Sequence, residues 1–311
     1  VGIERQLNST MNLNVSYIWS RGVRLYGVRD LNLGPLGANV TYNIQDASGA
    51  TVGTYTTPTY RTRLDPKYRR VSQIENPGLS YYDGLAVQLN KRYSHGFQAQ
   101  LAYTWSHAID FNQGGASNNI FFSPAPTTYA NGNYAAEKGT AANDVRHRMA
   151  INFVWAPTFT SSKTWTARYL INNWQLSQVT TLQSASPVTA SVNISGNAFT
   201  GALVSGSLNG LGGTNRVPFQ PVGNVNIDQV YKVDARLSKK LPFTERVTGY
   251  LTFEAFNLFN TPYDTSRRTP EYTLTGSNLV YRSDYNTPSS TAANPDGTTA
   301  RRAQVSLRVT F

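Results

Sequence analysis

The sequence predicts an all-β protein, an antiparallel transmembrane β-barrel of which this chain forms a C-terminal partial barrel of about nine long strands. Apolar and polar residues alternate along arms of more than ten residues, as in strands whose two faces meet different surroundings. The same two-strand unit recurs along the chain. Aromatic residues stand at the ends of the apolar rows. These observations favour bilayer-crossing strands with short periplasmic turns and long extracellular loops.

The clearest unit is a β-hairpin over residues 81–110. Its apolar residues occupy every second position, a period that places them on one face of a strand. They are Leu85, Val87 and Leu89, followed by Phe97, Ala99, Leu101, Tyr103 and Trp105. Polar residues such as Gln88 and Gln100 lie between them, and Gly96 can adopt the positive φ that a short hairpin loop needs.

Strand length and aromatic placement favour lipid over water outside this hairpin. A soluble β-sandwich shows the same alternation, but its strands usually have about 5 to 6 residues, against about 9 to 11 for a tilted strand that crosses a bilayer. Tyr103 and Trp105 stand at one end of the arm, with Tyr93 and Phe97 at the other. Membrane barrels carry their interfacial aromatic girdles in these positions.

Composition excludes several classes of protein. The 311 residues carry a net charge of +11, and 40% of them are hydrophobic. No run of eighteen apolar residues occurs, which excludes only helical spans. The absence of cysteine excludes disulfide scaffolds, thiol nucleophiles and cysteine-ligated metals. Because the chain begins at Val1 without a signal sequence, we expect an upstream region, either removed from a precursor or lying in a longer reading frame.

The N-terminal region repeats the hairpin. A strand over residues 1–6, a tight turn and a strand over residues 11–20 are predicted. Residues 17–20 (YIWS) match residues 103–106 (YTWS) at an offset of 86 residues. Residues 22–80 lack sustained periodicity and are predicted to form a long loop.

Five basic residues crowd into this loop, namely Arg61, Arg63, Lys67, Arg69 and Arg70. They indicate either a solvated loop tip or attraction to lipopolysaccharide phosphates or another anionic ligand. Nucleic acid is disfavoured, because no recognition helix or aromatic-basic motif accompanies the charge.

The remaining strands follow in order. After a loop over residues 111–143 come strands at 145–155 and 174–183, joined by a return over 157–171. A loop over 195–227 precedes a third hairpin, with arms at 231–241 and 247–255. A loop over 261–299 leads to the last strand, 302–311. Single-chain bacterial barrels have even strand numbers and cannot leave an edge unpaired in lipid. We therefore expect further strands upstream.

Several segments resemble the C-terminal barrel of TonB-dependent outer-membrane transporters, in particular the Oar-like branch with an N-terminal carboxypeptidase-regulatory-like domain. These segments are residues 82–96 (YDGLAVQLNKRYSHG), 102–106 (AYTWS), 144–148 (DVRHR), 173–177 (NWQLS), 254–260 (EAFNLFN) and the terminal aromatic strand. Each is short, but together they cover most of the chain in the right order.

The resemblance implies a barrel in the size class of the 22-stranded transporters, filled by a plug domain and driven by the TonB complex of the inner membrane. The plug and the TonB-contacting segment lie outside this chain, so any contact with TonB is expected through the missing region. The terminal strand resembles the signal read by the barrel-assembly machinery, with Val305, Leu307, Val309 and Phe311 as its residues.

No pattern of catalysis or cofactor binding occurs. His95, His107 and His147 have no other metal ligands at suitable spacing, and no nucleophile-elbow, zinc-protease or phosphate-loop motif is present. We therefore expect neither an enzyme nor a cofactor. In a barrel, one polar row points into the lumen, where it forms wall hydrogen bonds, contacts the plug or touches a passing substrate. The candidates are Arg148, Asn152, Lys232, Asp234, Arg236, Glu254 and Arg308.

Three functional hypotheses follow. The first is the barrel portion of a TonB-dependent transporter in the outer membrane of a Gram-negative-type bacterium, in contact with lipid and lipopolysaccharide. The second is an outer-membrane adhesin or structural surface protein, whose long tyrosine-rich loops bind partners without transport. The third is a secreted soluble β-sandwich or sugar-cleaving enzyme, which requires the aromatic rows to pack against a second sheet.

Overall fold

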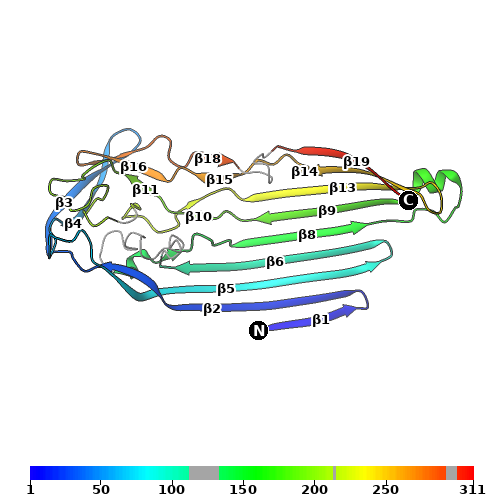
Figure 1. The fold of residues 1–311 in the computed structure, drawn as a ribbon, viewed down its shortest axis with the longest axis horizontal. Coiled ribbons are helices and arrows are strands. Elements are labelled where there is room, and N and C mark those ends of the chain that lie inside the picture. The colour runs from blue at the N-terminus through cyan, green and yellow to red at the C-terminus, as the bar shows by residue number, and fades with distance from the viewer. Residues whose placement is uncertain (112–132, 213–214, 292–299) are drawn as a thin grey trace.

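The computed structural model describes residues 1–111, 133–212, 215–291 and 300–311. Among the described residues, nine strands of a ten-stranded antiparallel sheet lie side by side in the order in which they occur in the sequence (Figure 1). They are β1 (Gly2–Asn8), β2 (Met11–Asp30), β5 (Ser72–Ser94), β6 (Phe97–Asp110), β8 (His147–Trp155), β9 (Trp174–Gln183), β13 (Val230–Pro242), β14 (Thr248–Phe256) and β19 (Arg302–Thr310). The all-β class and the long antiparallel strands predicted from the sequence are confirmed.

The strand register aligns the apolar residues into rows that cross the sheet. One row consists of Phe97, Trp155, Leu176, Leu237, Phe253 and Val305 on six successive strands. The row one residue away is mostly polar and consists of Gln98, Val154, Ser177, Arg236, Glu254 and Gln304. Side chains of adjacent rows point to opposite sides of the sheet. We call these sides the apolar face and the polar face.

Charged residues mark one border of the apolar face. Arg21 forms an ion pair with Asp83 (3.0 Å), and its guanidinium lies about 5 Å from the rings of Trp19 and Tyr81. On β6 the apolar residues extend from Phe97 to Trp105. That span agrees with the ~9 to 11 residues that a tilted strand needs to cross a bilayer.

The predicted loop over residues 22–80 is wrong in most of its length. β2 continues to Asp30 and β5 begins at Ser72, so both strands extend far beyond the apolar face. Between them lies a hairpin of β3 (Leu36–Gln45) and β4 (Thr51–Tyr60). These strands are rich in threonine and tyrosine, which fit a pleated sheet but give a weaker hydrophobic alternation than aliphatic residues.

Other long connections join this hairpin in a second sheet. β3 and β4 belong to a five-stranded sheet in the order β11 (Ser191–Asn193), β16 (Pro270–Thr275), β17 (Asn278–Tyr281), β3 and β4. The pairs β11–β16 and β17–β3 are parallel. We call this sheet, with the described segments of 31–71, 184–229 and 257–291 around it, the loop module. It occupies the end of the molecule opposite the short turns (Figure 1).

Several short elements complete the fold. β7 (Gly139–Thr140) pairs with the end of β6, β10 (Pro187–Val188) with β12 (Val225–Asn226), and β15 (Asp264–Arg267) with β18 (Pro288–Thr291). A 3-10 turn, η2 (Tyr134–Glu137), and a π-helix, η3 (Ala167–Ile171), lie in two connections. Among the described residues no helix is long and apolar enough to span a membrane. Parts of the predicted loops 111–143 and 261–299 lie outside the residues that the structure describes.

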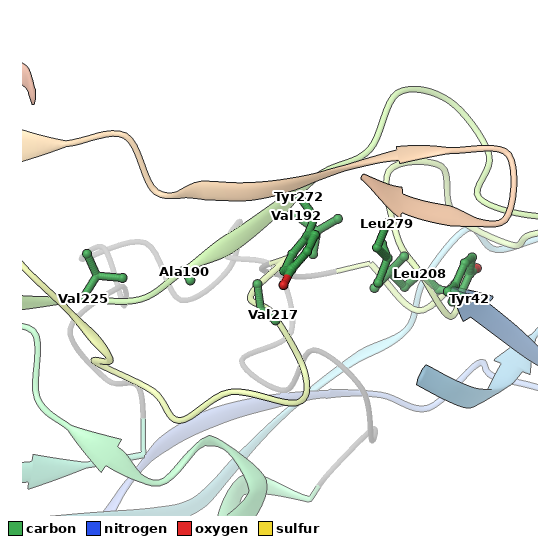
Figure 2. Packing of buried hydrophobic residues seen from close by; sticks show 8 residues of the cluster. All are labelled: Tyr42, Ala190, Val192, Leu208, Val217, Val225, Tyr272 and Leu279. Carbon is green, nitrogen blue, oxygen red and sulfur yellow. The ribbon is translucent and has the colours of Figure 1, made fainter. Parts of the chain in front are cut away.

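The buried hydrophobic core lies in the loop module. Figure 2 shows its members, which are Tyr42, Ala190, Val192, Leu208, Val217, Val225, Tyr272 and Leu279. They come from three connections far apart in the sequence, and the Tyr42 hydroxyl donates a hydrogen bond to the Leu208 carbonyl oxygen (2.7 Å). The loops of the sequence prediction therefore form one packed unit.

Buried ion pairs fasten the module to its surroundings. Arg63 pairs with the buried carboxylate of Asp30, and Arg216 pairs with Glu137 (Nε to Oε2, 2.9 Å). Arg61 stacks on Phe199, its Cζ 4.7 Å from the ring centre. The solvated-tip interpretation of the basic cluster is therefore wrong for Arg63.

Truncation of the module core should destabilise the module. Leu279 is fully buried, so Leu279→Ala should lower the free energy of unfolding of the module by about 2 to 5 kcal/mol. Protease cleavage within the module at rising urea concentration measures this change. The matched control is Leu64→Ala, because Leu64 is 67% exposed and its truncation should cost less than about 0.5 kcal/mol. Equal resistance of the two variants would contradict this placement of the core.

Candidate functional site

The polar face of the nine-stranded sheet is the candidate functional surface, because it gathers polar side chains from every strand. One row across it contains Asn12, Asn90, Gln100, Asn152, Val179 and Asp234. The amide of Asn152 donates to Gln100 Oε1 (3.3 Å). Such a row offers hydrogen-bond donors and acceptors to whatever lies against the sheet.

Two ion pairs organise the charges on β13 and β14. Arg236 pairs with Glu254, and the amide of Gln304 donates to the same carboxylate. Nearer the loop module, Lys232 pairs with Asp234 (3.1 Å). Asp234 Oδ1 also accepts a hydrogen bond from the backbone N–H of Asn257 (2.8 Å), which fixes the end of β14.

A hollow of about 460 Å³ lies beside the Arg236–Glu254 pair, toward the short turns. It is lined by Gln175, Arg236, Ser238, Tyr250, Thr252, Ser306, Arg308 and Thr310. Within the described part of the chain Arg308 takes part in no ion pair, whereas Arg236 is neutralised by Glu254. The hollow therefore presents a cation to an anionic or polar group.

All seven lumen candidates from the sequence lie on the polar face. The structure brings together Arg236 with Glu254 and Lys232 with Asp234, while Arg148, Asn152 and Arg308 stand apart from these pairs. Arg148 lies in register between Thr104 and Gln183. Contact of these seven residues with a substrate or a plug stays a prediction.

Sequence reasoning did not single out Gln304 and Tyr250 as site residues, although both fell in polar rows. Gln304 bonds to Glu254, and Tyr250 lies opposite Arg308 in the register. The alternation assigns a face to each residue but not its neighbours on adjacent strands, since the strand register is not visible locally.

The residues of the proposed assembly signal lie on the last strand. Val305, Leu307 and Val309 stand on the apolar face and are 65%, 67% and 47% exposed. Phe311 follows β19 and is 97% exposed. Among the described residues β19 pairs with β14 alone, and β1 with β2 alone. Recognition by the assembly machinery stays a prediction.

Two of the three histidines contact neighbouring side chains. His107 Nδ1 lies 3.3 Å from Asp144 Oδ2 and accepts a hydrogen bond from Arg146, and His147 Nδ1 lies 2.8 Å from the Tyr103 hydroxyl. In the described ranges no three histidine or carboxylate groups are placed to hold a metal ion.

Burial shifts the pKa of several tyrosines in the loop module and at its border. Burial raises the pKa of Tyr42 and that of Tyr134 to about 12. Burial, helped by the Glu271 carboxylate, raises the pKa of Tyr285 to about 12 and also raises that of Tyr272. A phenolate in these places would lose its hydration, so the neutral form is favoured.

The apolar face leaves large hydrophobic side chains exposed. Trp105, Phe253 and Leu307 on it are 52%, 42% and 67% exposed, and no second sheet covers them in the described structure. A two-faced antiparallel meander with an aromatic outer surface defines the class of outer-membrane β-barrels.

Comparison with known families places the chain more narrowly. The family described as "Outer membrane beta barrel domain" matches residues 1–279, and the chain belongs to this family. The protein is therefore located in the outer membrane of a Gram-negative bacterium. Contact of the apolar face with lipid, and of the polar face with the barrel interior, stays a prediction.

Solved structures of low identity match over nearly the whole chain. The outer membrane transporter YddB from Escherichia coli aligns at 9% identity with a TM-score of 0.46, covering 99% of this chain and 31% of that one. FpvA of P. aeruginosa, solved with a heterologous pyoverdine and iron, aligns at 10% identity (TM-score 0.39, coverage 99% and 32%). The siderophore receptor PirA from Acinetobacter baumannii aligns at 11% (TM-score 0.41, coverage 99% and 30%).

The chain thus spans about a third of the length of these structures. No curated protein matches the chain.

A charge placed in the middle of the lipid-facing rows should impair assembly. Leu101 lies opposite Leu89 and Ile151, midway between Phe97 and Trp105, so Leu101→Arg should cost about 2 to 4 kcal/mol. The matched control is Gln100→Arg on the polar face, which should be mild. Heat-modifiable gel mobility of the full-length protein in membranes measures the assembled fraction. Equal tolerance of both variants would contradict the assignment of the two faces.

Alkaline pH should loosen the module before the barrel. The phenols of Tyr42, Tyr134 and Tyr285 have an ordinary pKa of 10.0 and a folded pKa of about 12, so the folded state binds more protons between these values. Stability that is complete below pH 10 is therefore lost as the pH rises toward 12. Tyrosinate absorbance, followed together with protease cleavage of the module, measures the effect.

Tyr42→Phe should weaken this pH dependence, whereas Tyr68→Phe, at an exposed tyrosine, should leave it unchanged. Ionisation of every tyrosine near pH 10 with no change in cleavage would overturn the expectation.

Proposed function

We propose that this chain is the C-terminal barrel portion of a TonB-dependent transporter of the Oar-like branch, which takes up a substrate in the full-length protein. The observation that carries the proposal is the sheet itself, whose edge strands β1 and β19 each pair on one side only among the described residues. An unpaired edge in hydrocarbon costs several kcal/mol per backbone group, so further strands must complete the barrel.

The proposal assigns residues 1–311 to one part of a larger barrel, with a plug domain and the remaining strands elsewhere in the full-length protein. Nine strands in an open sheet leave room for a barrel of the plugged size class, near 22 strands.

The polar face supports a role in holding a plug or passing a solute. In this proposal two groups stabilise the barrel wall, since their charges are already compensated. They are the Arg236–Glu254–Gln304 group and the Lys232–Asp234 pair. Of the seven lumen candidates, Arg148 and Arg308 are the cations without an ion pair in the described structure, and they are left for a plug or an anionic solute. The TonB complex would act through the plug and not through this chain.

Lipid, lipopolysaccharide and the barrel-assembly machinery complete the proposed partners. The apolar face meets lipid, and the exposed Lys67 and Arg69 of the loop module suit lipopolysaccharide phosphates. Val305, Leu307, Val309 and Phe311 on the terminal strand suit recognition during assembly. No feature of the described structure suits nucleic acid.

The alternative proposal is an outer-membrane adhesin or structural surface protein. The loop module favours it, because a unit with its own buried core presents a defined surface rather than flexible loops. Leu36, Val52 and Tyr68 of that unit are 58%, 63% and 58% exposed. A partner could bind such a surface without any transport.

Solute depletion separates the two proposals. Cells with and without the full-length protein are grown in a defined medium, in the presence and absence of the TonB homologue, and residual solutes are quantified by mass spectrometry. Transport predicts at least one solute whose depletion needs both proteins. An unchanged solute profile, with loss of surface attachment in cells that lack the protein, would reject transport and favour the adhesin.

A further inference from the structure

The turn between β8 and β9 is a folded unit rather than a simple connection. We call residues 156–173 the foot. Asn172 closes it, since its side-chain Oδ1 accepts hydrogen bonds from the backbone N–H groups of Phe159 and Thr160 (2.9 and 3.1 Å), and its Nδ2 donates to the Thr160 carbonyl (2.7 Å). The foot contains η3 and projects beyond the strands at the short-turn end (Figure 1).

The foot is anchored to the neighbouring strand by two cationic side chains. Lys239 lies on the apolar face in register with Trp174, yet it is only 3% exposed. Its Nζ donates to the Asn172 carbonyl and lies 4.7 Å from the Trp174 ring centre. Arg168 and Tyr169 both donate to the Pro242 carbonyl at 2.8 Å. These contacts fix the foot beside the lipid-facing side of β13.

Held in this way, the foot exposes a cluster of large apolar side chains. Phe159, Trp165, Leu170 and Ile171 are 57%, 66%, 58% and 45% exposed. Phe159 meets Trp155 of the apolar face edge to face, with the ring centres 6.1 Å apart. The exposed cluster therefore continues the lipid-contacting surface past the end of the strands.

The charge around this cluster is basic. The foot carries Lys163 and Arg168 and no carboxylate, and in the turn between β13 and β14 Arg246 stands next to Glu245. Aromatic residues, lysine and arginine are enriched at a bilayer surface. The rings lie at the boundary between headgroups and acyl chains, and the cations bind the lipid phosphates. The short-turn end of an outer-membrane barrel faces the periplasm.

We propose that the foot is a membrane-surface anchor that lies in the periplasmic leaflet of the outer membrane. Phe159, Trp165 and Leu170 enter the boundary between headgroups and acyl chains, and Lys163 and Arg168 bind the phosphates of glycerophospholipids. We thus infer that the phospholipid layer itself covers the foot. Two features favour phospholipid over a protein partner, namely the continuity of the foot with the apolar face and its basic charge. The proposal rests on the barrel class alone and does not depend on transport.

Depth-dependent quenching tests the anchor. This chain lacks cysteine, so a full-length protein in which any cysteine outside residues 1–311 is replaced and Trp165→Cys is introduced can carry an environment-sensitive nitrobenzoxadiazole label at the foot alone. The protein is reconstituted in phosphatidylcholine vesicles with acyl chains brominated near the headgroup. We expect blue-shifted emission and about twofold quenching, since such surfaces insert about 5 to 10 Å. Added phosphatidylglycerol should increase the quenching.

Leu170→Cys is a second label position, which guards against a local fault in the Trp165 variant. The matched control is Ala47→Cys at the exposed tip of the β3–β4 hairpin, where the label should stay unquenched. Water-like emission at both foot positions would overturn the proposal. So would a blue shift without quenching by brominated lipid, because a protein partner or a second copy would then cover the foot. Quenching that does not rise with added phosphatidylglycerol would overturn the electrostatic contribution of Lys163 and Arg168.

Discussion

The pairing of backbone N–H and C=O groups across strands is the constraint on which this structure depends. Hydrocarbon offers these groups no partner, so a chain that crosses the outer membrane must satisfy them within the sheet. Seven of the nine strands, from β2 to β14, have a hydrogen-bonded neighbour on both sides in the described structure. The pleat then sends alternate side chains to lipid and to the interior, and the two faces of the sheet follow from the pairing.

This arrangement also decides where a hydrophobic core can form. A sheet with one apolar and one polar face, and with no second sheet over the apolar face in the described structure, has no dry protein layer of its own. The core built on Tyr42 and Leu279 therefore forms where the chain leaves the membrane, in the loop module. Threonine-rich strands and buried ion pairs such as Arg216–Glu137 suit that aqueous setting.

The sequence was sufficient to predict which residues share a face of the sheet, but not which residues they contact on neighbouring strands. Period-two alternation assigned Leu101 and Leu307 to lipid and Arg236 and Glu254 to the interior, because a face depends only on neighbours along the strand. The loop module was missed for the opposite reason. Its parallel pairing joins Asn43 to Asn278, and contacts between residues so distant in the sequence leave no local signal. The short alternation of Val40, Tyr42 and Ile44 was its one visible trace.

Arg236 and Lys239 show how strongly position governs a charge in this sheet, although they stand three residues apart on β13. Arg236 points to the interior and is compensated by the Glu254 carboxylate across the strand pair. Lys239 points to the apolar face and forms no ion pair with a carboxylate among the described residues. Its charge is compensated by the Asn172 carbonyl of the foot and by the Trp174 ring of β9. In the sequence taken alone, Lys239 is a charged residue at a position where the alternation of β13 calls for an apolar one. In the folded protein it joins the lipid-facing surface to the turn that extends it.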